Sequence, residues 1–341
     1  MIIDIIIATY NRHKKVLELV NQILNYFSGL NKIIIVDSSD SENQYLKSNP
    51  NIIYIRSSHR NQPYQRYIGY LLSKKEILLF IDDDVEITDK QTIYKLIKKF
   101  EDINISGLAL RIENKHSDTL LSRIPGTQLF KKRNVFWQIK GFLSGYPLLP
   151  VGKFGLCGNR GIYPRNEDRI EYINGAAFAA RRSAMFQNFN FQLFDIFEKG
   201  LGMGEDAIIG YSLSKQGKLI YYDELVFLHN DQKDSTYIIN IEAFAKRVAF
   251  SRLYLSLEKC RLDNRRLIIA RLHYHYYMFW RLTGLVLNYL INMNKVRLQM
   301  LKGTFKGWIL ATKFKFDRQN MKFKYWHDEA VKDLSTKIEH S

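Results

Sequence analysis

The fold of this chain is decided by the stretch ILLFIDDD at residues 77–84, in which five apolar residues run directly into three aspartates. A short apolar run of this kind predicts a buried β-strand. Three adjacent carboxylates repel one another unless water solvates them or a cation neutralises them. The stretch therefore predicts a strand whose carboxyl end is either a solvated acidic turn or a site for a hard divalent cation, Mg²⁺ or Mn²⁺, of the kind that bridges phosphates.

Strands and helices alternate on both sides of this stretch. Buried strands are predicted at residues 2–8, 32–36, 51–55 and 105–110, and helices at residues 13–27, 62–72 and 91–100. This alternation predicts an α/β fold with a mostly parallel sheet and flanking helices. Such sheets bind ligands at the carboxyl ends of their strands, where Asp37 and the three aspartates both fall.

The rest of the chain divides into a second part of the sheet and a helical end. Residues 112–172 are expected to form a loop-rich insertion that lines a site. Strands are predicted at residues 172–180, 219–222 and 225–228, and a helix at residues 205–215. After Tyr237 nearly everything is predicted to be helical, apart from a polar tail past Trp326. We therefore expect a catalytic domain over residues 1–236 and a basic helical region over residues 237–341.

The positive charge of the chain is concentrated in this helical region. The 341 residues carry a net charge of +17, and between Lys246 and Trp326 there are 18 Lys and Arg against three acids, a net charge of +15. Basic residues among aromatic and aliphatic ones are typical of helices that lie on anionic membranes. Helices that pack on the catalytic domain and expose a basic face are the alternative. We find no zinc-finger or single-strand-binding motif, so nucleic acid is not an expected partner.

Composition excludes several other classes of protein. The chain is 46% hydrophobic and 13% aromatic, which argues against disorder. Two cysteines are too few for a disulfide framework or a four-cysteine zinc site. The N-terminus lacks the basic lead-in of a signal peptide, and no apolar run reaches the ~18–20 residues of a membrane span. We expect a cytoplasmic protein that is peripheral on the inner face of the cell membrane.

Two further motifs carry candidate chemistry. Glu205 and Asp206 open a predicted helix, where carboxylates serve as caps or, beside a substrate hydroxyl, as a general base. The local sequence leaves both roles open. His229 ends an apolar run, and it is either a partly exposed loop residue or, together with the acidic cluster, a metal ligand.

Taken in order, these blocks resemble the family 2 glycosyltransferases with the GT-A fold, of the bacterial envelope polysaccharide type. The resemblance rests on IIIATYNR at residues 5–12, IIVDSSD at 34–40, NQPYQRYIG at 61–69, the DXD motif at 82–84, YINGAA at 172–177, the ED motif at 205–206 and His229. Many members have Gly where Pro63 stands and Asn where Tyr67 stands.

The resemblance implies a metal-dependent, inverting transfer of a sugar from a nucleotide-diphosphate sugar to a hydroxyl of a glycan or lipid-linked acceptor, with Mg²⁺ or Mn²⁺ as the cofactor. The implied nucleotide-binding residues are Thr9, Tyr10, Arg12, Asp37, Arg66, Asp82 and Asp83. The implied metal ligands are Asp84 and His229, and the acceptor-side residues are Asn174 and Gly175. Asp206 is the implied catalytic base, with Glu205 beside it. Two alternatives stay open: a nucleotidyltransferase that uses the same acidic metal site, and a nucleic-acid-binding protein whose acids are merely solvated.

Overall fold

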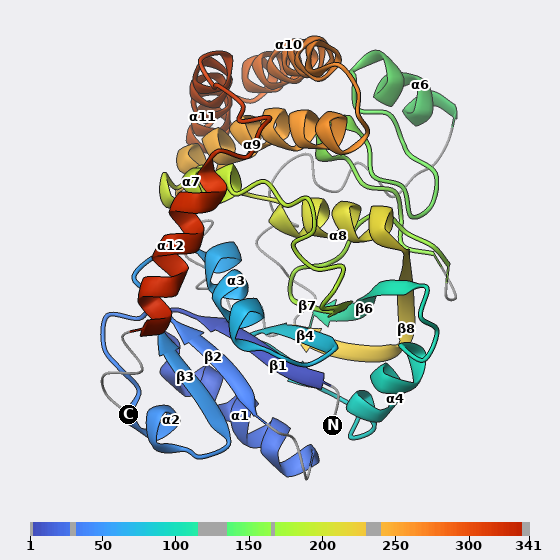
Figure 1. Cartoon of the computed structure of the whole chain (residues 1–341). Helices are drawn as coiled ribbons and strands as arrows, with labels where there is room; N and C mark the ends of the chain where they lie inside the picture. The colour runs from blue at the N-terminus through green and yellow to red at the C-terminus, as the bar shows by residue number, and fades with distance from the viewer. Residues whose placement is uncertain (1–2, 28–31, 115–134, 165–167, 230–239, 336–341) are drawn as a thin grey trace.

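The computed structural model describes residues 3–27, 32–114, 135–164, 168–229 and 240–335 (Figure 1). Over these residues the strands are β1 (Ile3–Thr9), β2 (Ile33–Asp37), β3 (Ile52–Arg56), β4 (Ile77–Asp82), β5 (Val85–Ile87), β6 (Ile105–Asn114), β7 (Ala177–Arg181) and β8 (Lys218–His229). They form one sheet in the order β3-β2-β1-β4-β7-β6-β8-β5. β1 to β4 are parallel, as are β6 and β8, whereas β7 and β5 run antiparallel to their neighbours.

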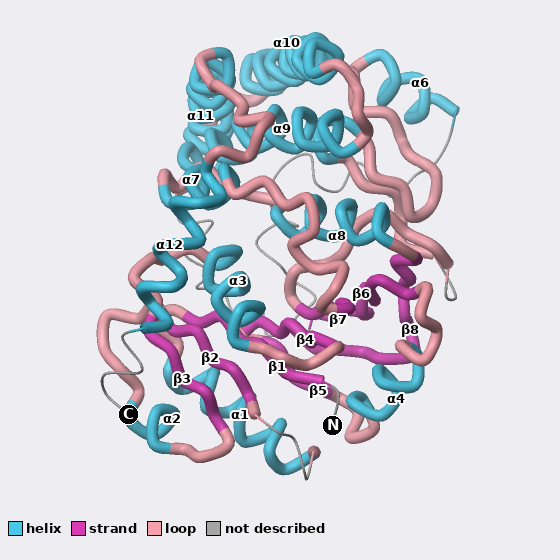
Figure 2. Tube along the Cα trace, viewed as in Figure 1, coloured by secondary structure: helices cyan, strands magenta, loops and turns pink. Residues whose placement is uncertain are grey.

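Helices cover both faces of this sheet and continue beyond it. They are α1 (His13–Tyr26), α2 (Gln44–Ser48), α3 (Gln62–Leu72), α4 (Thr92–Lys99), α6 (Val135–Leu143), α7 (Gln192–Glu198), α8 (Glu205–Gln216), α9 (Ile241–Leu262), α10 (Leu267–Ile291), α11 (Lys295–Thr312) and α12 (Lys322–Ser335). In Figures 1 and 2, α1, α2 and α4 lie below the sheet, α3, α8 and α12 lie above it, and α9 to α11 stack at the top. The predicted α/β class with a helical C-terminal region is confirmed.

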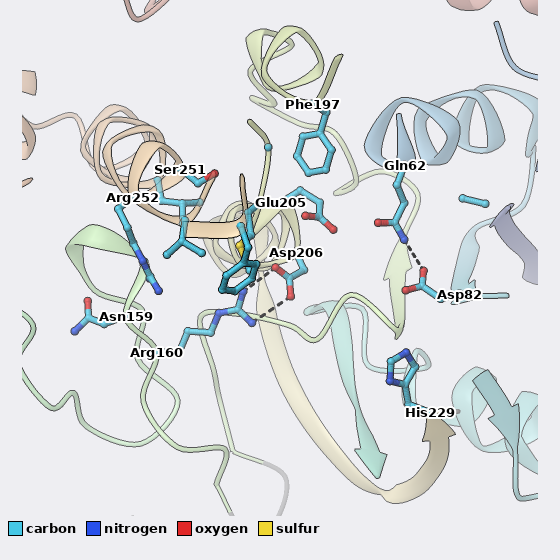
Figure 3. Close-up of a pocket in the computed structure, with 18 of the residues that line it drawn as sticks. Gln62, Asp82, Asn159, Arg160, Phe197, Glu205, Asp206, His229, Ser251 and Arg252 are labelled. Atoms are coloured by element: carbon cyan, nitrogen blue, oxygen red, sulfur yellow. Dashed lines mark hydrogen bonds and ion pairs between the residues drawn. The ribbon is translucent and has the colours of Figure 1, made fainter. Parts of the chain in front are cut away.

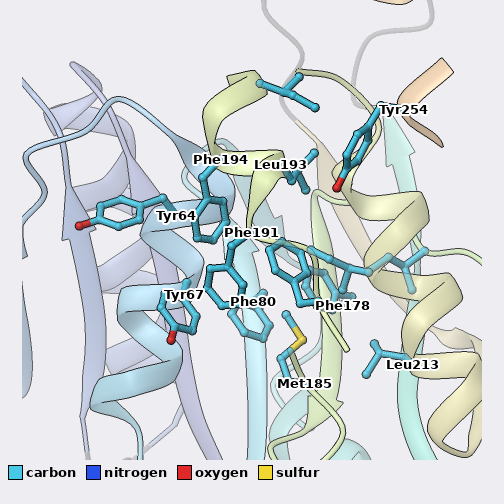
Figure 4. Close-up of a cluster of buried hydrophobic side chains, with 14 of the residues drawn as sticks. Tyr64, Tyr67, Phe80, Phe178, Met185, Phe191, Leu193, Phe194, Leu213 and Tyr254 are labelled. Carbon is cyan, nitrogen blue, oxygen red and sulfur yellow. The ribbon is translucent and has the colours of Figure 1, made fainter. Parts of the chain in front are cut away.

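The sheet has a hydrophobic core on each face because side chains alternate along a strand. Ile5 and Ile7 of β1 belong to the core between the sheet and helices α1 and α4, and Ile6 belongs to the core on the opposite face. Figure 4 shows part of this second core, in which Phe80 and Phe178 stack with ring centroids 4.7 Å apart. All these residues are almost fully buried, so the central strands have no solvent-facing side.

The structure corrects the sequence-based elements in several places. The strand predicted at residues 172–180 begins only at Ala177, and the predicted loop-rich insertion contains the helix α6. Residues predicted as two strands at 219–222 and 225–228 form the single strand β8, with an irregularity between Tyr222 and Val226. The short strand β5 was not predicted, since three residues carry no periodicity. The polar tail predicted past Trp326 was wrong, because α12 continues to Ser335.

The C-terminal helices share a core with the sheet. Phe250 and Tyr254 of α9 belong to the same buried cluster as Ile6 and Phe178. α11 lies close against α9, since a Cβ atom on Gly303 would be 2.2 Å from the carbonyl oxygen of Glu242. The domain boundary between residues 236 and 237 stays a prediction. No helix in the described part of the chain is long and apolar enough to cross a membrane.

Trp326 ties α12 to the rest of the molecule. Its side chain is 2% exposed, its ring packs against Tyr64 and Phe194, and its indole Nε1 donates a hydrogen bond of 2.7 Å to Asp195 Oδ1. The end of the chain is therefore part of the folded core.

We predict that Trp326→Ala lowers the free energy of unfolding by about 3–5 kcal/mol, because it leaves a cavity and removes one hydrogen-bond donor to Asp195. Urea denaturation followed by circular dichroism measures this loss. Val331→Ala on the same helix is the control, since Val331 is 48% exposed and should change stability by less than about 0.5 kcal/mol. Equal effects of the two substitutions would contradict the docking of α12.

Candidate active site

A pocket of about 1290 Å³ opens at the carboxyl ends of β1 and β4 (Figure 3). Its walls come from these strand ends, from the N-terminus of α8, from the end of β8, from the insertion and from α9. The predicted site residues that line it are Thr9, Tyr10, Arg12, Asp82, Asp83, Asp84, Glu205, Asp206 and His229. Segments far apart in the sequence thus converge on one cavity, as the parallel sheet predicted.

The aspartates after β4 are held by a cation rather than solvated. Arg12 Nη1 lies 2.8 Å from Asp83 Oδ1 and 2.7 Å from Asp84 Oδ2. Thr9 donates a further hydrogen bond of 2.7 Å to Asp83 Oδ2. The carboxylates of Asp83 and Asp84 are 5% and 11% exposed. The solvated acidic turn is therefore excluded.

His229 lies against the last of these aspartates. Its Nε2 is 3.2 Å from Asp84 Oδ1. The antiparallel pairing of β5 with β8 places Val85 opposite His229, and so brings the preceding Asp84 to the imidazole. Burial alone would raise the pKa of Asp84, but the hydrogen bond and charge of His229, with Arg12, outweigh burial and lower this pKa.

Asp84 and His229 have the donor atoms that a divalent cation takes. The described residues contain no group of three or more His, Cys, Asp or Glu side chains that converges on a cation site. A carboxylate oxygen and an imidazole nitrogen that already face each other nevertheless suit Mn²⁺ or Mg²⁺, whose remaining ligands are often water and phosphate oxygens. The pair fits the implied metal, provided that Arg12 releases Asp84.

Arg66 joins the end of β4 to the start of α8 from behind the pocket wall. Its side chain is 3% exposed, and its Nη2 donates to Asp82 Oδ1 at 2.8 Å and to the carbonyl oxygen of Gly175 at 2.7 Å. Its Nη1 lies 3.4 Å from Glu205 Oε1. Burial and the nearby charges of Asp84 and Asp83 raise the pKa of Asp82 to about 7, against the opposing effect of Arg66.

The carboxylate pair of α8 faces the pocket next to an arginine that the sequence analysis missed. Arg160 holds Asp206 in a bidentate ion pair, with Nη2 2.7 Å from Oδ1 and Nη1 3.1 Å from Oδ2 (Figure 3). The backbone N–H of Ala207 donates a hydrogen bond of 2.8 Å to the same Oδ1. Burial, together with the charge of Asp206, raises the pKa of Glu205. Nothing in the sequence singled out Arg160 beyond its place in the insertion.

Four predicted residues do not line the pocket. Arg66 lies behind its wall, and Asp37 is fully buried, accepting a hydrogen bond of 2.5 Å from the hydroxyl of Tyr54. Asn174 Oδ1 accepts a hydrogen bond from its own turn, 3.1 Å from the N–H of Ala176. Gly175 does not line the pocket, but its backbone N–H donates a hydrogen bond of 3.3 Å to Asp206 Oδ2. The binding roles of these residues stay predictions.

Gln65 is a second residue that sequence reasoning missed. Its Nε2 donates to the carbonyl oxygens of Thr9 at 2.9 Å and of Val36 at 2.7 Å. These bonds fasten the ends of β1 and β2 to α3. A buried Gln in a helix gives no sequence signal, because its partners are backbone atoms of other strands.

Comparison with known proteins agrees with this geometry. Residues 4–165 match the family model described as Glycosyl transferase family 2. The chain contains a family 2 glycosyltransferase domain. It is therefore a glycosyltransferase, and its α/β architecture is the GT-A fold, as the sequence resemblance implied. No curated protein matches the chain by sequence.

Several solved structures are similar to this chain at low sequence identity, and TarS shares its fold. TarS 1–349 from S. aureus is 13% identical with a TM-score of 0.53, covering 98% of this chain and 89% of that one. The complex of TarS 1–349 with UDP-GlcNAc is 11% identical with a TM-score of 0.51 and the same coverage. The mannosyltransferase PcManGT from Pyrobaculum calidifontis, in complex with GDP-Man and Mn²⁺, is 11% identical with a TM-score of 0.47, covering 91% and 87% of the two chains.

Proposed function

We propose that this glycosyltransferase moves a sugar from a nucleotide-diphosphate sugar to a hydroxyl of a glycan or lipid-linked acceptor, with inversion at the anomeric carbon. The observation that carries this proposal is the meeting of two groups in one pocket: the aspartates after β4 and the carboxylate pair of α8. The structure of TarS with UDP-GlcNAc supports a donor of this class, since the two chains share a fold.

The donor would lie at the ends of β1 and β4. Thr9, Tyr10, Arg12, Asp82 and Asp83 line this part of the pocket, and Asp37 and Arg66 support it from behind. Asp84 and His229 would hold Mg²⁺ or Mn²⁺. When bound, the cation supplies positive charge to the departing diphosphate. Arg12, which can pair with either aspartate, would turn to the phosphates once the cation takes its place.

Asp206 would act as the catalytic base. Arg160 and the N–H of Ala207 fix its carboxylate at the N-terminus of α8. A carboxylate held in this way can accept the proton of an acceptor hydroxyl that comes within hydrogen-bond reach. The hydroxyl then attacks from the face opposite the leaving diphosphate, and a single displacement inverts the configuration. Asn174 and Gly175 would shape the acceptor side from the adjoining turn.

The two alternatives are less favoured. A nucleotidyltransferase would also need a strand-end metal site, but the family match points to sugar transfer. A nucleic-acid-binding protein with solvated acids conflicts with the burial of Asp83 and Asp84 and with their pairing to Arg12.

We also propose that the protein binds an anionic membrane at the cytoplasmic face. Residues 264–316 contain ten Lys and Arg and no Asp or Glu. On α6 and α10, large apolar side chains are exposed at Ile139, Phe142, Leu143, Ile268, Leu272, Tyr276, Phe279, Trp280, Leu287 and Leu290. We call these residues the α6–α10 face. Tyr276 donates a hydrogen bond to the carbonyl oxygen of Leu143, so the two helices form one surface (Figure 1). Exposed apolar side chains in a region with such an excess of cations suit an anionic lipid surface.

The first prediction concerns the metal. Asp84→Ala should lower transfer by roughly 10³-fold, because a catalytic cation contributes several kcal/mol to the transition state. His229→Ala should be less severe, since one charged ligand remains. Calorimetric titration of Mn²⁺ in the presence of UDP, with a radiolabelled sugar-transfer assay, measures both effects. Transfer that is unchanged by EDTA would contradict the metal role.

The second prediction concerns the base. Asp206→Asn keeps the shape of the side chain and removes the proton acceptor, so transfer should fall by about 10²–10⁴-fold while donor affinity is retained. Single-turnover transfer and equilibrium donor binding separate the two quantities. If this variant transfers sugar at a near-normal rate, the base is Glu205 or another group.

The third prediction concerns the membrane. Phe279→Glu should weaken binding to vesicles that contain phosphatidylglycerol, because it removes apolar burial of about 1.5–3 kcal/mol and adds repulsion. The matched control is Tyr94→Glu on α4, which replaces an aromatic side chain that is 66% exposed outside the α6–α10 face. Co-sedimentation at low and high salt is the measurement. Equal binding to neutral and anionic vesicles, or no binding to either, would contradict the membrane proposal and favour helices that only pack on the catalytic part.

A further inference from the structure

Arg252 is a cation on the pocket wall whose guanidinium has no carboxylate partner in the described part of the chain. It lies on α9, partly buried, and its Nη1 donates a hydrogen bond of 2.6 Å to the carbonyl oxygen of Cys157. Its Cζ lies 5.4 Å from the ring centroid of Tyr146. A guanidinium carries five N–H donors, and a cation withdrawn from water without a counter-charge is unfavourable. The remaining donors are therefore suited to an anionic ligand.

The other arginines of the pocket are already paired with carboxylates. Arg12 pairs with Asp83 and Asp84, and Arg160 pairs with Asp206. Arg252 thus differs from them because no carboxylate of the described residues neutralises its positive charge. A ligand anion can bind it without breaking an existing ion pair.

Arg252 lies on the acceptor side of the catalytic carboxylates. A Cβ atom on Gly158 would be 2.9 Å from Arg252 Nη1, which places the guanidinium beside the loop that carries Arg160. In Figure 3, Arg252 and Arg160 lie on one side of Asp206, and Asp82 and His229 lie on the other. An anion bound at Arg252 is therefore separate from a diphosphate bound next to Asp84.

The wall next to Arg252 is apolar and extends to α10. Residues 146–149, Phe244 and Val248 line the same pocket. The ring of Tyr146 is 5.5 Å from that of Tyr277 on α10. A ligand that fits this half of the pocket has an anionic group at Arg252 and an apolar portion along the wall toward α10.

We propose that Arg252 binds a phosphate group of the acceptor, and that this acceptor is a phosphate ester with an apolar chain. The role of this ligand as the acceptor rests on the proposed function, whereas the phosphate-binding site does not. A guanidinium matches two phosphate oxygens with two N–H donors. In a lipid phosphate, the phosphate stands between the apolar chain and the polar headgroup, just as Arg252 stands between the apolar wall and Asp206.

The test is the binding of decyl phosphate to the full chain by calorimetry. We expect Arg252→Gln to weaken binding roughly 10- to 100-fold, the effect of losing a charged hydrogen-bond partner, and Arg252→Lys to restore part of it. Lys246→Gln is the matched control, because it removes a positive charge from the same helix at a residue outside the pocket lining. Equal affinity in wild type, Arg252→Gln and Lys246→Gln would overturn the proposal.

Three further comparisons sharpen the assignment. Decanoate should bind more weakly than decyl phosphate, and equal binding would overturn the preference for phosphate. Glycerol phosphate should also bind more weakly, and equal binding would overturn the lipid source in favour of a soluble ester. Decyl phosphate should bind equally well with and without Mn²⁺ and in Asp84→Ala. Binding that requires Mn²⁺ and Asp84 would place the phosphate in the donor site and overturn the acceptor assignment.

These outcomes separate this proposal from the proposed function. A chain that binds decyl phosphate through Arg252 but transfers no sugar from any nucleotide sugar would contradict the proposed function and support the phosphate site. If the protein transfers sugar and Arg252→Gln leaves the KM for the acceptor unchanged, the proposed function is supported and the phosphate site is contradicted.

Discussion

The arrangement of the active site depends on the buried guanidinium of Arg66. It bonds to the carboxylate of Asp82 and to the carbonyl oxygen of Gly175, and it lies 3.4 Å from Glu205. These three groups come from the end of β4, the turn before β7 and the start of α8. A buried cation between two carboxylates offsets the desolvation of both. It therefore fixes the separation between the donor side and the acceptor side of the pocket.

Pairing with a buried or half-buried arginine also stabilises the other carboxylates of the site. Each one that borders the pocket is matched with a cation, as Arg12 matches Asp83 and Asp84 and Arg160 matches Asp206. These pairs lower the cost of gathering five carboxylates in one cavity. They also imply that ion pairs are exchanged on ligand binding, because a metal ion at Asp84 and His229 must compete with Arg12 for the carboxylate of Asp84. The carboxylates of the pocket are thus neutralised by internal cations, and a metal ion binds at Asp84 only by replacing Arg12.

Much of the sheet and of the donor side could be predicted from the sequence. Strands β1 to β4 are short, largely apolar runs that end in polar residues, so both the strands and their functional ends are local signals. Other features depend on tertiary partners and left no such signal. β5 exists only because β8 pairs with it, and that pairing brings His229 to Asp84. Arg160 is one of several arginines in the insertion, and only its bidentate contact with Asp206 distinguishes it.

The helical C-terminal region was expected to stand apart from the catalytic part, and α9 shows why composition could not settle its role. One side of α9 contributes Phe250 and Tyr254 to the core above the sheet, and another contributes Arg252 and Leu255 to the pocket. Charge and apolar content describe the region as a whole, whereas these contacts depend on which residues face inward. Since α9 contacts both the pocket and α10, binding of the α6–α10 face to a lipid surface would orient the acceptor half of the pocket toward that surface.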